Sequence, residues 1–395
     1  MALITYILGD CPGCKAQNTF GNVDVYGDHI YRGCKRCRYH EHVDLPPLHK
    51  KVLYLDQFFF SHAFRGGDAR FVAAAERIER LASLQLLVAP FSSIHEDETH
   101  LWEKRDELLK FIKATARGHE FEAAYEVEQT QMVKSFQAWL ADKPAEYALD
   151  PSDAVEDDMH HWDSYMRIDV GRYMGDIELI RDVKKQSIEG LVNLFEGWRK
   201  LQTPFEEDLQ AEYQVAGKAY VDFYLEFALR VADGDHMAMF DAPIISQVVQ
   251  TMLHVIPNEV PPDQKLRKCA EFLVSDHFKE LPYQWLNTHM LATLKLLVKN
   301  GAYANPDRAR QKLSGVFYDV KHIATYSPYV DAFVMDQPMA DLVSRPTVQL
   351  EERYATKVFS LNNWDDFLAW LDQLEGEMSA EHREGLQLAY PTKAK

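Results

Sequence analysis

A short apolar run that ends in a carboxylate constrains the fold of this chain more than any other stretch. Residues Val52 to Leu55 are apolar and β-prone, and polar residues flank them. A run of this length predicts a buried strand. In an α/β sheet, ligands bind at the carboxyl ends of the strands, so Asp56 is the first candidate for a functional site.

Three later runs predict further strands of the same sheet. Leu86 to Pro90 follows the break at Gly66-Gly67-Asp68 and a helical apolar pattern. The intervening helix is long enough for a crossover, so this second strand should run parallel to the first. Asp331 to Asp336 and Val358 to Leu361 are the remaining candidates. The expected fold class is therefore α/β.

The second predicted strand leads into a short helix that carries several acids. Ser92-Ser93 caps this helix, and helical spacing places Ser92, His95 and Glu98 near one face. Glu98 is the preferred second acid of the site, with Glu96 as the fallback. An acid in a first helical turn also complements the helix dipole without any further role, so that interpretation stays open.

Carboxylates at strand ends and helix starts suit a divalent cation. Mg2+ and Mn2+ prefer oxygen ligands, and such a cation orients a water and neutralises charge on a phosphodiester. Composition alone does not establish that these acids converge.

Four of the five cysteines form two C-x2-C pairs near the amino end. Cys11 and Cys14 are separated from Cys34 and Cys37 by a segment with the alternation of a β-hairpin around Gly27-Asp28. Two such pairs complete a tetrahedral Zn2+ site, and the segment resembles a zinc ribbon. The fifth cysteine, Cys269, lies in a helical pattern, and we expect it to be an inert packed thiol.

Basic residues cluster around the second cysteine pair. The formal net charge is -18, yet residues 1 to 51 carry seven Lys and Arg against five acids. Contact with a phosphate backbone should therefore begin near the amino end. The candidate contacts are Arg32, Lys35, Arg36 and Arg38. The alternative is that they form ordinary solvated surface.

The chain divides into a zinc ribbon at residues 1 to 48 and a larger domain at 49 to 395. A mostly helical stretch, about 112 to 300, interrupts the larger domain, whose core covers about 50 to 111 and 306 to 375. We expect the polar tail from Ser379 onward to be loosely held. No apolar run is long enough to span a bilayer and no signal peptide is evident, so a soluble cytoplasmic protein without membrane contact is expected.

The larger domain resembles a PIN-like nuclease domain. Three stretches carry this resemblance: Tyr54-Leu55-Asp56-Gln57, then Ser92-x-x-His95-x-x-Glu98, and then Asp319 to Ala324 followed by Pro328 to Asp336. The resemblance implies a parallel sheet between helices and an acidic site that hydrolyses nucleic acid with Mg2+ or Mn2+. It makes Asp56, Glu98, Asp319 and Asp336 metal ligands, with Asp331 as an additional or substitute ligand. The long helical insertion departs from a compact PIN-like domain.

These features favour a metal-dependent nuclease that acts on RNA in preference to DNA, through carboxylates that hold the metal and position a water. The alternative is a non-catalytic adaptor that binds nucleic acid through the zinc ribbon. A third interpretation is a phosphatase for a small metabolite, although no phosphate-cradling motif is present. A homodimer, or a protein partner bound through the helical insertion, is compatible with each.

Overall fold

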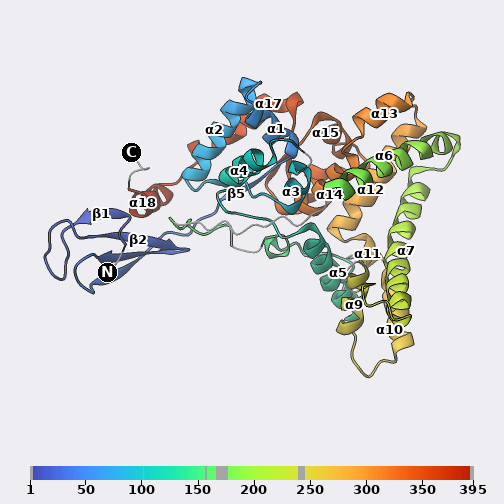
Figure 1. The fold of residues 1–395 in the computed structure, drawn as a ribbon, viewed down its shortest axis with the longest axis horizontal. Coiled ribbons are helices and arrows are strands. Elements are labelled where there is room, and N and C mark those ends of the chain that lie inside the picture. Colours follow the sequence, from blue (N-terminus) through green and yellow to red (C-terminus); the bar gives the residue numbers. More distant parts are fainter. Residues whose placement is uncertain (1–2, 101, 156–157, 166–176, 239–244, 392–395) are drawn as a thin grey trace.

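The chain folds into a mixed α/β structure with two four-stranded sheets (Figure 1). The computed structural model describes residues 3–100, 102–155, 158–165, 177–238 and 245–391, so parts of the predicted helical insertion lie outside it. One sheet is antiparallel, in the order β1-β2-β3-β4. The other is parallel, in the order β6-β5-β7-β8.

The parallel sheet confirms all four strands expected in the larger domain. Its members are β5 (Lys51–Leu55), β6 (Leu87–Val88), β7 (Ala332–Val334) and β8 (Lys357–Phe359). The central strands pair in register, with Leu53 beside Ala332 and Leu55 beside Val334. Because the strands are parallel, the carboxyl ends of β5 and β7 meet at one edge of the sheet.

Helices cover both faces of this sheet, because side chains alternate between the faces along each strand. Leu53 and Leu55 pack in a core with one group of helices. That group is α1 (Gln57–Arg65), α2 (Ala69–Ser83), α4 (Arg105–Ala116) and α17 (Trp364–Gly376). In α2 the apolar residues recur at helical spacing, which buries Phe71, Ala74 and Ile78 on one side.

The opposite face forms a second core around Tyr54, whose ring stacks on Phe333 with the centroids 4.5 Å apart. Helices α14 (Val316–Tyr326) and α15 (Gln337–Val343) pack there. They are joined by helices from the predicted insertion, namely α5 (Ala124–Leu140), α6 (Ile177–Lys200) and α12 (Pro282–Lys299). Part of the stretch at 112 to 300 therefore completes the core over the sheet.

The remainder of the helical stretch has an apolar core of its own. Phe136, Tyr220 and Phe272 pack there. Cys269 is fully buried in the same cluster, and burial raises the pKa of its thiol to about 12, as expected of an inert packed cysteine. The outer helices are α7 (Phe205–Ala232), α9 (Ile245–Val255), α10 (Pro262–Phe272) and α11 (Asp276–Lys279). Three shorter helices are α3 (Ser93–Thr99), α13 (Pro306–Lys312) and α16 (Leu350–Tyr354).

The antiparallel sheet contains the predicted hairpin. Its strands are β1 (Tyr6–Gly9), β2 (Phe20–Tyr26), β3 (His29–Cys34) and β4 (His40–Asp44). The chain turns between β2 and β3 at Gly27, whose φ of +62° lies in the left-handed region that favours glycine. Gly21 in β2 allows the neighbouring strand to approach, since a Cβ there would lie 1.8 Å from the Tyr6 carbonyl oxygen.

The carboxyl-terminal segment is packed against the ribbon, so the expectation of a loosely held tail is wrong. Helix α18 (Ala380–Ala389) lies beside β1 and β2 (Figure 1). Leu386 and Tyr390 share an apolar cluster with Val25 and Ile30. The Asn22 side chain also donates to the Leu388 carbonyl at 2.8 Å. Within the described ranges, no helix combines the length and apolar character needed to cross a bilayer.

Candidate metal centres

Two acids cap helices at the carboxyl ends of the central strands. Asp56 follows β5 and accepts a hydrogen bond from the Gln57 amide at 2.7 Å, while Asp336 follows β7 and accepts from the Met339 amide at 2.9 Å. Helices α1 and α15 cover opposite faces of the sheet. The chain continues from β5 to β6 on one side of the sheet and from β7 to β8 on the other. In open α/β sheets, ligands bind in the crevice between two such strands.

Helices α3 and α14 bring further ligand groups to Asp56. Oxygen atoms of Asp56 and Glu98 and a ring nitrogen of His322 lie within 4.8 Å of one another, a grouping that can hold a metal ion. The distance from Glu98 Oε2 to His322 Nε2 is 3.5 Å. Asp319 precedes His322 by three residues on α14, so the two side chains share one helix face.

The acids of this group lie close enough to affect the protonation of Asp56. Burial raises the pKa of the Asp56 carboxyl well above its ordinary value, and the negative charges of Asp319, Glu98 and Asp336 raise it further. Burial also raises the pKa of Asp336. Like charges gathered in a poorly solvated place destabilise the ionised forms. A divalent cation would relieve that repulsion.

The predicted His95 has a positioning role beside this group. Its Nε2 donates to the Leu55 carbonyl at 2.8 Å, and its Nδ1 accepts from the Ser92 amide at 3.0 Å. These bonds attach the start of α3 to the end of β5, one residue before Asp56. Burial, together with the neighbouring His322, lowers the pKa of the His95 imidazole to about 3, so His95 is neutral at physiological pH.

His322 and Tyr54 are site residues that the sequence-based prediction did not assign. Tyr54 is fully buried on β5, and its hydroxyl hydrogen-bonds to Ser92 Oγ at 2.9 Å and to His322 Nδ1. The available signal was spacing, because His322 follows Asp319 by one helical turn and Tyr54 shares a strand face with Asp56. A histidine on an apolar helix face is too common in protein cores for that spacing to single it out.

The structure separates Asp331 from the other acids, which corrects its expected role as a ligand. Asp331 precedes β7 at the amino end of the sheet, where its carboxylate accepts from the Val52 amide at 2.8 Å and pairs with Lys51 at 2.6 Å. At about 3.3 Å per residue, Val52 lies roughly 13 Å from Asp56 along β5. The fallback acid Glu96 instead faces Lys113 of α4, at 3.4 Å.

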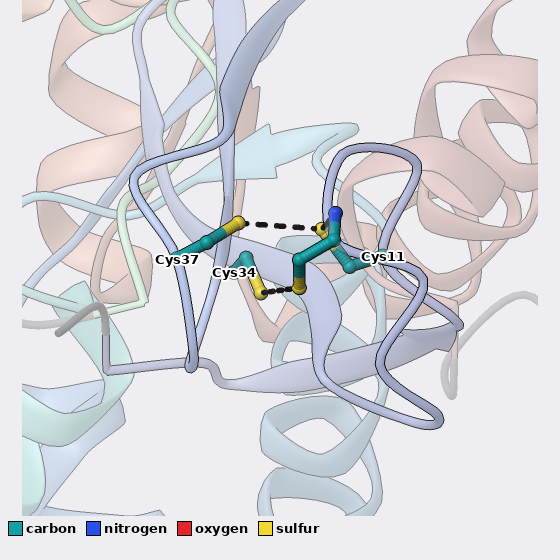
Figure 2. A group of neighbouring side chains, drawn as sticks. Cys11, Cys34 and Cys37 are labelled. Carbon is teal, nitrogen blue, oxygen red and sulfur yellow. Dashed lines mark hydrogen bonds between the residues drawn. The ribbon is translucent and has the colours of Figure 1, made fainter.

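The four ribbon cysteines form a second candidate centre. Their sulfur atoms lie within 4.8 Å of one another, and the Cys11 and Cys37 sulfurs are 3.7 Å apart (Figure 2). The Cys14 and Cys34 sulfurs are 3.8 Å apart. Four sulfurs at about 2.3 Å from a tetrahedral Zn2+ are separated by about 3.8 Å, whereas a disulfide requires about 2.05 Å. The spacing therefore fits zinc.

Backbone amides donate hydrogen bonds to three of the four cysteine sulfurs. The amides of Cys14, Arg36 and Tyr39 donate to the sulfurs of Cys11, Cys34 and Cys37, at 3.3 to 3.4 Å. The hydroxyl of Thr19, together with backbone N–H groups, lowers the pKa of the Cys34 thiol to about 6. Thiolates are the form that binds Zn2+, so the ribbon is suited to a structural metal.

The predicted basic cluster on the ribbon divides into two kinds of side chain. Arg32 is half-buried, donates to Asn22 Oδ1 at 2.9 Å and pairs with Glu41 at 3.4 Å. It is therefore part of the sheet structure, which corrects its assignment as a phosphate contact. Arg36 and Arg38 are exposed and Lys35 is half-buried, so these three remain available at the surface.

A cleft of about 670 Å³ lies beside the acid group. Gln337 and Pro338, which directly follow Asp336, line one side of it. The cationic lining residues are Arg308, Lys312 and Arg345. All three are exposed, and within the described part of the chain none of them forms an ion pair. Unpaired cations next to an acidic group are a suitable arrangement for a polyanion that approaches a metal.

Searches against protein-family models, curated proteins and solved structures find no match for this chain. The structure itself defines a mixed α/β protein with a candidate four-cysteine zinc centre and a separate group of acids and a histidine.

Proposed function

We propose that this protein is a metal-dependent nuclease of the PIN-like type that cleaves RNA in preference to DNA. The observation that carries the proposal is the grouping of Asp56 and Glu98 with His322 within 4.8 Å of one another, beside Asp319 and Asp336, whose charges raise the pKa of Asp56. The four acids come from four separate segments of the chain. Repulsion between these carboxylates destabilises the folded protein, so acids with no role beyond solvation would be better placed apart.

Each part of the site has a chemical role in this proposal. A bound Mg2+ or Mn2+ supplies Lewis acidity and neutralises charge that develops on the phosphodiester. Asp56 and Glu98 would hold the ion, and Asp319 and Asp336 would add negative charge beside it and help to orient a water. Asp56 and Asp336 are held in place by amide hydrogen bonds from Gln57 and Met339, so their carboxylates are oriented before any ligand arrives.

The cationic cleft supports a polymeric substrate over a small phosphorylated metabolite. Arg308, Lys312 and Arg345 line the cleft together with the acid Asp341, so the cleft offers three cations against one acid. A nucleic-acid backbone places phosphates in a series, and each phosphate neutralised by protein contributes to a salt-dependent affinity. The net charge of -18 would repel a polyanion from most other surfaces.

The decisive experiment incubates labelled single-stranded RNA, single-stranded DNA and free nucleotides with the protein in Mn2+, Mg2+ or EDTA. Wild type should cleave the RNA only with metal, and Asp56→Asn should reduce the rate at least about 100-fold. Asn still caps α1, so folding should be retained. Asp331→Asn is the matched control, because Asp331 is a strand-end acid outside the group, and it should cleave normally. Undiminished cleavage by Asp56→Asn would refute the proposed site, and release of phosphate from nucleotides alone would favour a phosphatase.

A second candidate function is nucleic-acid binding without catalysis, and the surface of the ribbon favours it. Tyr31 and His42 lie opposite one another on β3 and β4, with ring centroids 5.3 Å apart. Tyr26, His29 and His40 extend this row of rings. Planar rings next to exposed arginines are typical platforms for unpaired bases. Binding that depends on Tyr31 and Arg36, with intact substrate under every metal condition, would favour this function over the nuclease.

A further inference from the structure

One buried nitrogen at the acid group has no hydrogen-bond partner. His322 is 1% exposed, and within the described residues its buried Nε2 atom makes no hydrogen bond, while Glu98 Oε2 lies 3.5 Å away. This nitrogen points to the place shared with Asp56 and Glu98. Leaving a buried polar atom unsatisfied costs about 1 to 3 kcal/mol, so an ordinary core histidine would have both nitrogens bonded.

A chain of hydrogen bonds connects Nδ1 of His322, through Tyr54 and Ser92, to His95. The Leu55 carbonyl can only accept, so His95 Nε2 carries a hydrogen and His95 Nδ1 is an acceptor. Ser92 Oγ lies 3.2 Å from that acceptor and 2.9 Å from the Tyr54 hydroxyl. In the arrangement in which Ser92 donates to His95 and Tyr54 donates to Ser92, the Tyr54 oxygen accepts from His322 Nδ1. His322 Nε2 then has a free lone pair.

We propose that His322 Nε2 is a ligand of the cation held by Asp56 and Glu98, and that this nitrogen makes the site select Mn2+ over Mg2+. The inference rests on the proposed metal-dependent function and defines the metal for that same site. Tyr54 is a positioning residue, because it holds Nδ1 and so directs Nε2 toward the carboxylates.

The selectivity follows from ligand chemistry. Mg2+ demands oxygen ligands in a near-ideal octahedron and gives up its waters reluctantly. An imidazole nitrogen is a softer ligand that suits transition-metal ions better. A ligating histidine almost always donates its other ring N–H to a fixed acceptor, and the Tyr54 oxygen lies in hydrogen-bond contact with Nδ1 of His322, where it can serve as that acceptor. A mixed set of carboxylates and one imidazole therefore favours Mn2+.

The test is pulsed electron paramagnetic resonance on Mn2+-loaded wild-type protein, combined with calorimetric titration of Mn2+ and Mg2+. Wild type should show electron spin echo modulation from a directly bound imidazole nitrogen, and 15N-labelled histidine should change that modulation. The candidate zinc centre contains only cysteine ligands, so it contributes no such signal. Mn2+ bound to wild type without nitrogen modulation would overturn the inference, as would no Mn2+ binding at millimolar concentration.

Variants assign the signal to one residue. His322→Gln should abolish the nitrogen modulation and weaken Mn2+ binding at least about tenfold. The ratio of the Mn2+ affinity to the Mg2+ affinity should fall by a similar factor. Tyr54→Phe keeps the ring in the core and should weaken both the modulation and the preference. His100→Gln is the matched control, because His100 borders α3 but binds the Glu96 carbonyl through Nδ1, and it should behave as wild type. Unchanged modulation in His322→Gln would also overturn the inference.

Failure of this inference is distinguishable from failure of the proposed function. Metal-dependent RNA cleavage without nitrogen modulation would leave the nuclease in place with an all-oxygen metal site. Nitrogen modulation with every nucleic acid intact would support the metal site and refute the nuclease.

Discussion

At the scale of single residues, the acid group carries a stability cost that metal should remove. Asp56 is 7% exposed, and its carboxyl has a pKa raised by burial and by three neighbouring acids. An acid whose pKa is raised on folding stabilises the folded state below its unfolded pKa of about 3.9. That contribution is lost as the pH rises through the folded pKa. The metal-free protein is therefore destabilised by Asp56 at neutral pH.

We expect Asp56→Asn to stabilise the protein in EDTA and to lose the stabilisation that Mn2+ confers on wild type. Its melting temperature at pH 7 in EDTA should rise by roughly 2 to 4 °C, and the gain should shrink as the pH falls. In Mn2+ the order should reverse, because ligand binding to the native state stabilises only a protein that binds. Thermal scans of both proteins from pH 5 to pH 8, with and without Mn2+, measure this. A lower melting temperature for Asp56→Asn in EDTA would contradict the account of mutual repulsion.

At the scale of elements, helix α18 and the ribbon sheet form one packed unit. Gly385 of α18 makes the close approach feasible, because a Cβ there would lie 2.5 Å from the Trp162 ring and 2.9 Å from Pro46. Trp162 also donates to the Pro46 carbonyl at 2.9 Å. The ribbon is thereby joined to both the linker and the end of the chain.

Gly385→Ala should loosen this contact and reduce the free energy of unfolding by about 1 to 3 kcal/mol, as overpacking typically does. Gly376→Ala is the matched control, since a Cβ at this helical glycine meets nothing within 4 Å. That control should be neutral or more stable by up to about 1 kcal/mol. Urea unfolding of both variants measures the difference, and equal effects would show that the contact at Gly385 is not tight.

Bound Zn2+ should stabilise the fold of the ribbon, residues 1 to 48. Native mass spectrometry should find about one Zn2+ per wild-type chain and none in Cys34→Ser, because a structural site needs all four ligands. Proteolysis of Cys34→Ser should then begin within residues 1 to 48, as the sheet loses the energy of metal binding. Cys269→Ser is the control and should keep its zinc. Full zinc content in Cys34→Ser would refute the assignment of the four cysteines as zinc ligands.

At the scale of the whole molecule, Asp163 joins segments that are far apart in sequence. Its carboxylate pairs with Lys50 at 2.6 Å and with His119 at 3.1 Å, and it also accepts from Gln85. Its carbonyl accepts from the Tyr390 hydroxyl. Burial alone would raise the pKa of Asp163, but the hydrogen bond from His119 and the charge of Lys50 hold it well below its ordinary value. The linker, the sheet domain and the end of the chain meet at this carboxylate.

Asp163→Asn should cost about 3 to 5 kcal/mol of unfolding free energy, because it removes the carboxylate that neutralises the charge of Lys50, which is only 1% exposed. A lowered folded pKa stabilises the protein above the unfolded pKa, so wild type should lose this contribution as the pH falls below about 4. The variant should show a weaker acid dependence. Asp222→Asn, which breaks an exposed pair with Lys218, should change stability by less than about 1 kcal/mol. Urea titrations from pH 3 to pH 7 measure both effects.

Local patterns in the sequence determined the elements and their types. The apolar run before Asp56, the cap at Ser92-Ser93 and the spacing of the ribbon cysteines each depend on residues close together in the chain, so they predicted a strand, a helix start and a thiolate group. The α/β class followed from strands that alternate with helices.

Only the tertiary structure decided which of these residues meet. The register between β5 and β7 places Asp331 at the amino edge of the sheet and Asp336 at the carboxyl edge, although both flank the same short strand. Helix packing brings Nε2 of His322 close to Asp56, and it packs against the ribbon a carboxyl-terminal segment that we expected to be loosely held. The reason is physical, because a local pattern determines a residue's own conformation, whereas its neighbours in space depend on burial and pairing across the whole chain.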